Sequence, residues 1–159
     1  MRIKDAQIIR QIEQLGEHYR TNLANRFLRP LLLQLQIDKH TWDQIEFFTE
    51  KIELLQFDGI HLDELYRQIA ACAKFIEVAR NNLIPSLKYK VSAMPNNSDK
   101  ILRDMAASNF SSNLQVFADL LNEIYISLAA MDKKNSGEKP PVYTQVMELQ
   151  SLGRLLVGS

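Results

Sequence analysis

The chain has 159 residues, a length that fits one domain with a hydrophobic core of its own. Its 19 basic and 19 acidic side chains balance, so it lacks the basic excess that general nucleic-acid-binding proteins carry. One cysteine, Cys72, excludes a disulfide framework within these residues and fits a reducing compartment. Five glycines are few for a fold built on tight turns, which favours long helices with few connections.

Targeting and membrane signals are not evident in the sequence. Asp5 and Glu13 interrupt the N-terminal region where a secretory signal needs an unbroken apolar run. No uninterrupted apolar stretch approaches the roughly 20 residues that span a bilayer. We therefore expect a cytoplasmic protein without a membrane span.

Charge is distributed unevenly along the chain. Residues 43–64 carry seven acidic side chains against Lys51 alone, whereas residues 67–90 carry five basic side chains against Glu77. This pattern favours an acidic helix packed antiparallel to basic neighbours. The alternative is a bipolar surface that steers a charged partner.

The first expected helix has apolar residues at spacings of three and four, which is one face of an α-helix: Ile8, Ile12, Leu15, Tyr19 and Leu23. Pro30 restricts the residue before it, so this helix should end or kink near Leu28. Residues 31–37 and 86–94 both alternate apolar and polar positions, so each is compatible with a strand or with a helix. We favour helix for both, because an isolated two-stranded ribbon is marginal in water.

The second expected helix has a recognisable start. Thr41 and Gln44 have the spacing of a capping box, in which each side chain satisfies a free backbone N–H of the first turn. Gly59 is placed to end this helix. Its apolar stripe comprises Trp42, Ile45, Phe48, Ile52 and Leu55.

Two more helices follow in the sequence. The third has a regular apolar stripe from Leu62 to Leu83 and small residues at 70–73, where a neighbouring helix can approach closely. Pro85 should stop or kink it. The fourth is expected over about 98–131, with a bend as an open alternative at residues 108–113, which are weak helix formers.

The C-terminal region divides into a polar tether and an amphipathic segment. Residues 132–140 contain glycine and proline among charged residues and are expected to be a flexible linker. Pro141 suits the first turn of a final helix over 141–159. Its apolar stripe is Val142, Val146, Leu149, Leu152 and Leu156.

These elements predict an all-α fold, an antiparallel bundle of four to five helices with proline kinks at Pro30 and Pro85. Residues 1–131 form the predicted core. The apolar C-terminal helix should be covered, either by its own bundle or by a second subunit, and a free arm that awaits a partner is the remaining alternative.

Catalytic, cofactor-binding and metal signatures are missing from the sequence, and we expect none of these sites. No histidine follows a glutamate by three positions, as di-iron bundles require, and His61 with Glu64 is a better match to helix capping than to metal binding. The phosphate-binding loops and the nucleophile elbow are also absent. Cys72 lies among alanines on an apolar face, which predicts a structural thiol.

The adjacent Phe47 and Phe48 point about 100° apart on a helix, so they cannot share one narrow seam. We favour burial of both, and the alternative is that one is exposed to a partner. The sequence therefore indicates a non-enzymatic protein that binds another protein or itself, as an adaptor, chaperone-like factor or regulator. The candidate partner-binding residues are Val142, Val146, Leu149, Leu152, Leu156 and Phe47. A small-ligand-binding or sensory bundle is the alternative.

Overall fold

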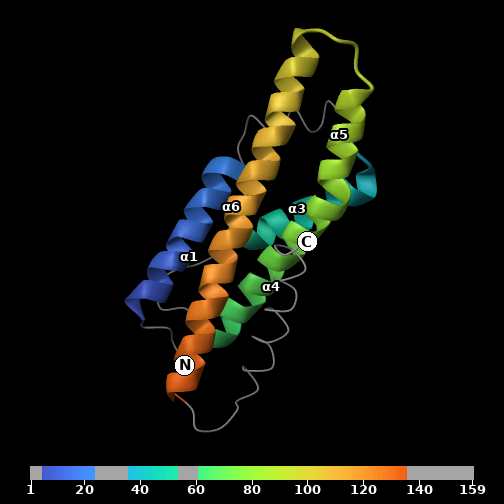
Figure 1. Cartoon of the computed structure of the whole chain (residues 1–159). Helices are drawn as coiled ribbons and strands as arrows, with labels where there is room; N and C mark the ends of the chain where they lie inside the picture. Colours follow the sequence, from blue (N-terminus) through green and yellow to red (C-terminus); the bar gives the residue numbers. More distant parts are fainter. Residues whose placement is uncertain (1–4, 24–35, 54–60, 136–159) are drawn as a thin grey trace.

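The computed structural model of the chain describes residues 5–23, 36–53 and 61–135, and its regular elements there are all helical, which confirms the all-α prediction (Figure 1). Two of these elements are single π-helical turns, η1 and η2, each continuous with an α-helix. In chain order the elements are α1 (Ala6–His18), η1 (Tyr19–Leu23), α3 (Lys39–Glu53), α4 (Leu62–Val78), η2 (Ala79–Leu83), α5 (Ile84–Ser92) and α6 (Ser98–Asn135).

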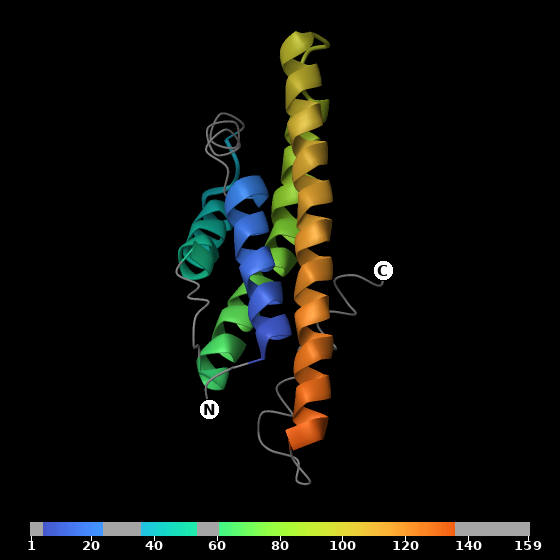
Figure 2. The same cartoon turned by 90° about the vertical axis from the view of Figure 1, so that its left-hand side faces the viewer.

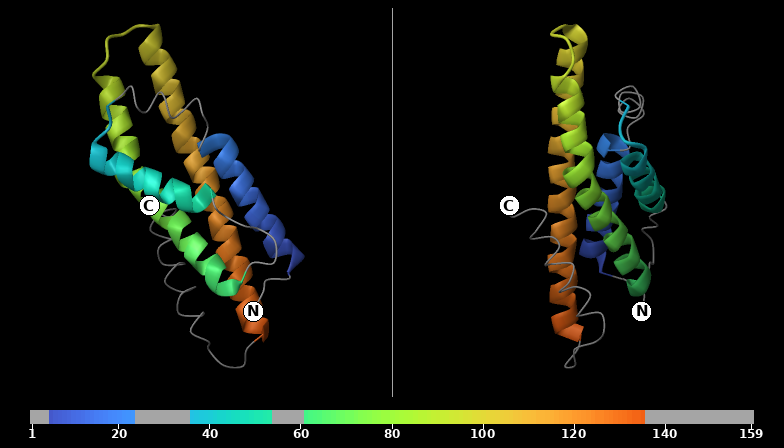
Figure 3. Two further views of the ribbon diagram at one scale, coloured as in Figure 1. Left: turned by 180° about the vertical axis from the view of Figure 1, so that it is seen from behind. Right: turned by 90° about the vertical axis from the view of Figure 1, so that its right-hand side faces the viewer.

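The longest helix, α6, is the element against which the others assemble. It runs antiparallel to α1 and to the continuous rod formed by α4, η2 and α5 (Figures 1 and 2). Helix α3 lies obliquely across this arrangement and packs on α4 and η2 (Figure 3). The ends of α5 and α6 extend together beyond the rest of the bundle as a helical hairpin, which we call the α5–α6 arm (Figure 1).

The core lies where α1, α4 and α6 meet. Three aromatic rings are in contact there: Tyr19 lies 5.5 Å from Phe75 and 5.7 Å from Phe117, measured between ring centroids. Phe75 and Phe117 are 6.2 Å apart in an edge-to-face arrangement, a geometry that the quadrupoles of the rings favour. The elements η1, α4 and α6 therefore each contribute one ring to a single aromatic cluster.

The predicted core face of the first helix is confirmed: Ile8, Ile12, Leu15, Tyr19 and Leu23 are all buried. The helix begins after Asp5, whose carboxylate accepts hydrogen bonds from the backbone N–H groups of Gln7 and Ile8 at 2.9 and 3.4 Å. This satisfies two donors that the first helical turn would otherwise leave without partners.

The predicted capping box at Thr41 is wrong, because α3 begins earlier. Asp38 precedes the helix, and its Oδ2 accepts from the backbone N–H of Thr41 at 3.1 Å and from the Thr41 hydroxyl at 3.3 Å. The carboxylate is a stronger acceptor than a hydroxyl for the free N–H groups at the positive end of a helix. Thr41 thus lies inside the first turn and is buried.

Residues 86–94 are mainly helical, as favoured: α5 extends to Ser92. Pro85 occupies the second position of α5, directly after the π turn η2. A proline there removes one backbone donor and crowds the preceding turn, and a wider turn accommodates both. Residues 31–35, Pro30 and Gly59 lie outside the described residues. Gln36 forms a turn with a φ of 49°.

Helix α6 is continuous from Ser98 to Asn135, so the alternative of a bend at residues 108–113 is not realised. It also extends through residues 132–135, which the sequence analysis placed in the linker. The remainder of the linker and the predicted C-terminal helix, with Val142, Val146, Leu149, Leu152 and Leu156, lie outside the described residues.

Candidate protein-interaction surfaces

Helix α6 carries apolar residues on two opposite faces. Its buried face includes Phe110, Leu114, Phe117, Leu121, Ile124 and Leu128. On the other side, the large apolar residues Ile101, Leu102, Met105, Val116 and Ile126 are exposed by 63, 62, 58, 44 and 59%. At 3.6 residues per turn these five fall within a sector of about 120°, opposite the buried face. We call them the outer face of α6.

The outer face is densest on the α5–α6 arm. Ile101, Leu102 and Met105 all lie in the first turns of α6, and Tyr89 of the adjoining α5 is 73% exposed. A single exposed apolar side chain is ordinary, whereas several on one protruding element mark an interaction surface. Methionine suits such a surface because its flexible thioether adapts to a partner.

The length and apolar composition of α6 also meet the requirement for crossing a membrane, over Ser98–Met131. Part of this apolar character belongs to the core, because the face with Leu114, Phe117 and Leu121 packs inside the bundle. Core helices of water-soluble proteins meet the same requirement for that reason. The absence of a membrane span stays a prediction.

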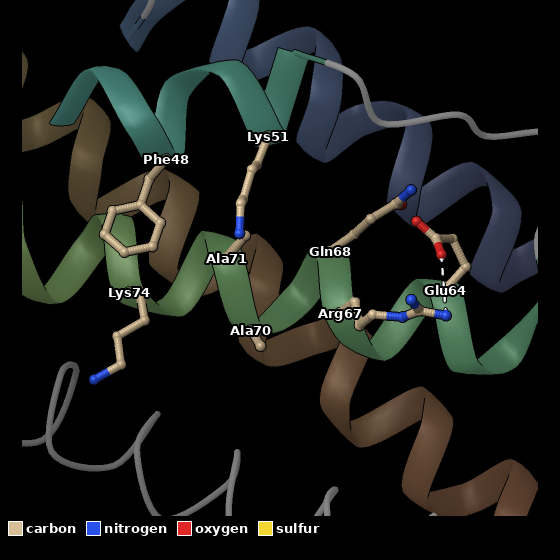
Figure 4. Close-up of a pocket in the computed structure, with 8 residues that line it drawn as sticks. All are labelled: Phe48, Lys51, Glu64, Arg67, Gln68, Ala70, Ala71 and Lys74. Atoms are coloured by element: carbon tan, nitrogen blue, oxygen red, sulfur yellow. Dashed lines mark ion pairs between the residues drawn. The ribbon is translucent and has the colours of Figure 1, made fainter. Parts of the chain in front are cut away.

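A groove of about 460 Å³ lies between α3 and α4 (Figure 4). Its lining residues are Phe48, Lys51, Glu64, Arg67, Gln68, Ala70, Ala71 and Lys74. Phe48 and Lys51 project from α3 toward α4 (Figure 4). On α4, the small side chains of Ala70 and Ala71 leave space between longer side chains. We call this the α3–α4 groove.

Charged groups border the α3–α4 groove. Arg67 pairs with Glu64 at 3.4 Å, and Lys74 pairs with Glu77 at 3.2 Å, both within α4. Lys51 lies 4.3 Å from the centroid of the Phe47 ring, in cation–π geometry. Helix α3 packs on α4, so the acidic segment of the sequence lies beside the basic one. The two ion pairs, however, both form within α4.

Phe47 is 52% exposed, so the favoured burial of both phenylalanines is wrong. Phe48 packs partly against the core, and its ring contacts that of Phe47 at 5.3 Å. One helix face cannot bury two adjacent positions, and here the neighbouring element covers only the Phe48 side. Phe47 is the candidate partner-binding residue that the structure describes, and it lies beside Lys51 at the edge of the α3–α4 groove.

Cys72 and Tyr125 are two of the titratable side chains buried in the interior. Burial raises the pKa of the Cys72 thiol far above its ordinary value. Burial also raises the pKa of the Tyr125 hydroxyl, and the proximity of Cys72 raises it further. Both groups stay protonated at neutral pH, so Cys72 is a packed thiol as expected, not an activated nucleophile.

Sequence reasoning missed two polar networks that join the π turns to the middle of α6. In the first, the His18 ring bonds the backbone carbonyl of Asn113, and Nδ2 of Asn113 donates to the carbonyl of Asn22 at 3.4 Å. In the second, Arg80 donates to Gln115. Nothing in the local sequence signals these contacts, because each partner lies on a helix distant in the chain.

In the described stretches, no group of three or more metal-ligating side chains is close enough to hold an ion. Comparison with known proteins found no matching family model, no similar curated protein and no similar solved structure. The described residues present two candidate surfaces for binding: the outer face of α6 and the α3–α4 groove.

Proposed function

We propose that this chain is a non-enzymatic, cytoplasmic helical protein that acts by binding another protein through the outer face of α6. The observation that carries the proposal is the exposure of Ile101, Leu102 and Met105, each by more than half, on one face of a protruding arm. A partner helix or groove that covers this face would remove apolar surface from water, which is the main driving force for association.

The arm is suited to binding because its two helices pack against each other through buried residues while their outer residues are exposed. Leu87 and Val91 of α5 are buried in the hydrophobic core, and so is Ala107 of α6. Beyond these contacts the outer residues face solvent. A pre-formed surface of this kind loses little conformational entropy when a partner binds.

The test uses full-length protein in which Ile101 and Met105 are both replaced by glutamate. The matched control is Gln7→Glu with Gln14→Glu, two exposed positions on α1 that change the charge by the same amount. We expect the α6 variant to remain folded by circular dichroism and to lose the partner that the wild type retains in affinity capture. The control should retain it.

Light scattering of the purified protein separates a foreign partner from a second copy. A monomer that becomes larger only with the captured protein supports the proposal. If the wild type is a dimer and the α6 variant is a monomer, the outer face instead joins two copies of this chain. Equal capture by wild type and the α6 variant contradicts this use of the surface.

A small-ligand-binding bundle is the second candidate, and the α3–α4 groove favours it. Its volume of about 460 Å³ lies in the range of ligand sites. The Oε1 atom of Gln68 in its lining is buried and has no hydrogen-bond partner among the described residues. Groove-lining variants such as Ala71→Phe should then abolish ligand binding, whereas the α6 variant should not affect it.

A further inference from the structure

We propose that the partner which covers the outer face of α6 is an amphipathic helix that carries lysine or arginine about four turns away from its apolar residues. This rests on the proposed function and deepens it, because it gives the chemistry of the partner that the same surface takes. Three observations carry it: the position of two carboxylates on α6, the lack of a balancing cation beside them, and the poor match of this surface to a second copy of itself.

The first observation is the position of Asp119 and Glu123. At 3.6 residues per turn both fall within the sector of about 120° that holds the outer face, and both are exposed. Met105 on the arm precedes Asp119 by 14 positions, which is about 21 Å along the helix axis. Helix α6 is straight over this length (Figure 2). A partner helix that covers the apolar side chains of the arm therefore reaches both carboxylates when it continues for four turns.

The second observation is that no ion pair balances these carboxylates. Asp119 accepts a hydrogen bond from Nε2 of Gln115 at 2.9 Å, and an amide is a neutral donor. Arg80 contacts the same Gln115 through its other amide atom. Neither Asp119 nor Glu123 forms an ion pair with any residue that the structure describes. Both charges are therefore available to a partner.

Helix α6 itself supplies no cation to this sector. Its basic residues between Ser98 and Met131 are Lys100 and Arg103, and on a 3.6-residue helix both fall about 80° or more outside the sector. Burying a carboxylate without a partner is costly, because it loses its hydration and gains nothing in return. A helix that covers this part of α6 must therefore bring its own positive charge.

The third observation is that a second copy of α6 does not meet this need. A parallel pair of α6 helices places Asp119 opposite Asp119. An antiparallel pair with Ile101 opposite Ile126 places Glu123 opposite Asp104, which is also exposed. Like charges set against each other destabilise an interface and exclude wrong partners. The charge pattern therefore favours a different, basic chain over a second copy.

Selection of displayed helical peptides on the immobilised full-length chain tests the proposal. Each peptide has a fixed apolar cluster near one end and, about four turns away on the same face, two positions filled by Lys, Gln or Glu. Two sets, with the cluster near either end, cover both orientations of the partner. The test variant is Asp119→Lys with Glu123→Lys. The matched control is Glu13→Lys with Glu17→Lys, two exposed positions on α1 with the same spacing and the same change of charge.

We expect the wild type and the control to enrich Lys over Glu at the two varied positions by about tenfold or more, and the test variant to reverse this preference. The preference should weaken at high salt, because salt screens charges at an exposed surface. All the substituted positions are exposed, so circular dichroism should show that each protein remains folded.

Two results would overturn the basic partner and leave the proposed function intact. One is binding without a charge preference that is lost when Ile101 and Met105 are replaced by glutamate. The other is a preference for Lys that Asp119→Lys with Glu123→Lys does not change, which places the recognised charge elsewhere. If the wild type enriches no peptide above the level of the Ile101→Glu and Met105→Glu protein, the proposed function and the basic partner both fail.

Discussion

His18 and Asn113, which are 95 positions apart in the chain, are joined by a hydrogen bond of 2.9 Å between the imidazole Nε2 and the backbone carbonyl oxygen. A carbonyl only accepts, so Nε2 carries the proton. In the neutral ring Nδ1 is then an acceptor, and Nδ2 of Asn22 lies 3.1 Å from it in position to donate. The His18 ring thus bridges the first π turn to the middle of α6.

Replacing His18 with alanine should lower the free energy of unfolding by about 1–3 kcal/mol, because it leaves partly buried polar groups of Asn22 and Asn113 without their partner. Urea denaturation measures this. His40→Ala, at an exposed position, should change stability by less than about 0.5 kcal/mol. Equal effects of the two substitutions would show that the bridge contributes nothing to stability.

Phe117 and Val116 are neighbours on α6 with opposite surroundings, the first fully buried and the second 44% exposed. Phe117→Ala removes one ring of the aromatic cluster and leaves a cavity, so we expect a loss of about 3–5 kcal/mol. Val116→Ala should stay within about 0.5 kcal/mol. Thermal and urea unfolding of both variants test this; a mild effect of Phe117→Ala would place the core elsewhere.

Stability should fall at alkaline pH because burial raises the pKa of Cys72 above its ordinary 9.0 in the folded state. The contribution is fully present below pH 9 and is lost as pH rises further, since only the unfolded chain then releases the proton. The slope is at most about 1.4 kcal/mol per pH unit for each such group. Unfolding measured from pH 7 to 11 should show a shallower decline for Cys72→Ala, and an unchanged slope would contradict the burial effect.

Asp38, not Thr41 with Gln44, caps α3. Asp38→Ala should therefore destabilise the protein by about 0.5–2 kcal/mol, because two hydrogen bonds to Thr41 are lost. Asp38→Asn, which keeps an acceptor oxygen, should restore most of the difference. Chemical denaturation of the wild type, Asp38→Ala and Asp38→Asn measures the contribution of the cap. If Asp38→Ala is as stable as the wild type, Asp38 does not cap α3 and Thr41 is the better candidate.

The chain should remain in solution in the presence of lipid vesicles, because one face of α6 is already occupied by the core of the bundle. Flotation with neutral and anionic vesicles on a density gradient is the measurement. Recovery of the folded protein with the lipid fraction would mean that α6, which is long and apolar enough to span a bilayer, enters it.

Much of the fold follows from local pattern. Apolar spacings predicted α1 and α4, because a helix must place such residues on one side and cover them. The stripe from Ile8 to Leu23 is buried throughout. The start of α3 was predicted wrongly. Asp38 and Thr41 can both accept hydrogen bonds at the start of a helix, and the sequence does not indicate which of them is the N-cap.

The surfaces were harder to predict. The sequence does not separate the outer face of α6 from its core face, because Leu102 and Met105 continue the apolar spacing of the buried residues although both are exposed. Which of two apolar faces is buried depends on where the neighbouring helices end, and α1 and α4 end below the α5–α6 arm (Figure 1). The α3–α4 groove likewise combines residues of two helices and has no signature in either.

The sequence by itself determined that the described residues are helical, where α4 and α6 begin, and which residues are apolar enough to need cover, since these depend on contacts between residues three and four apart. Only the tertiary structure decided that Phe47 is exposed, that His18 meets Asn113, and that α6 presents a second apolar face. Those properties depend on which distant segments pack together, because each helix buries its apolar face against the faces of the other helices.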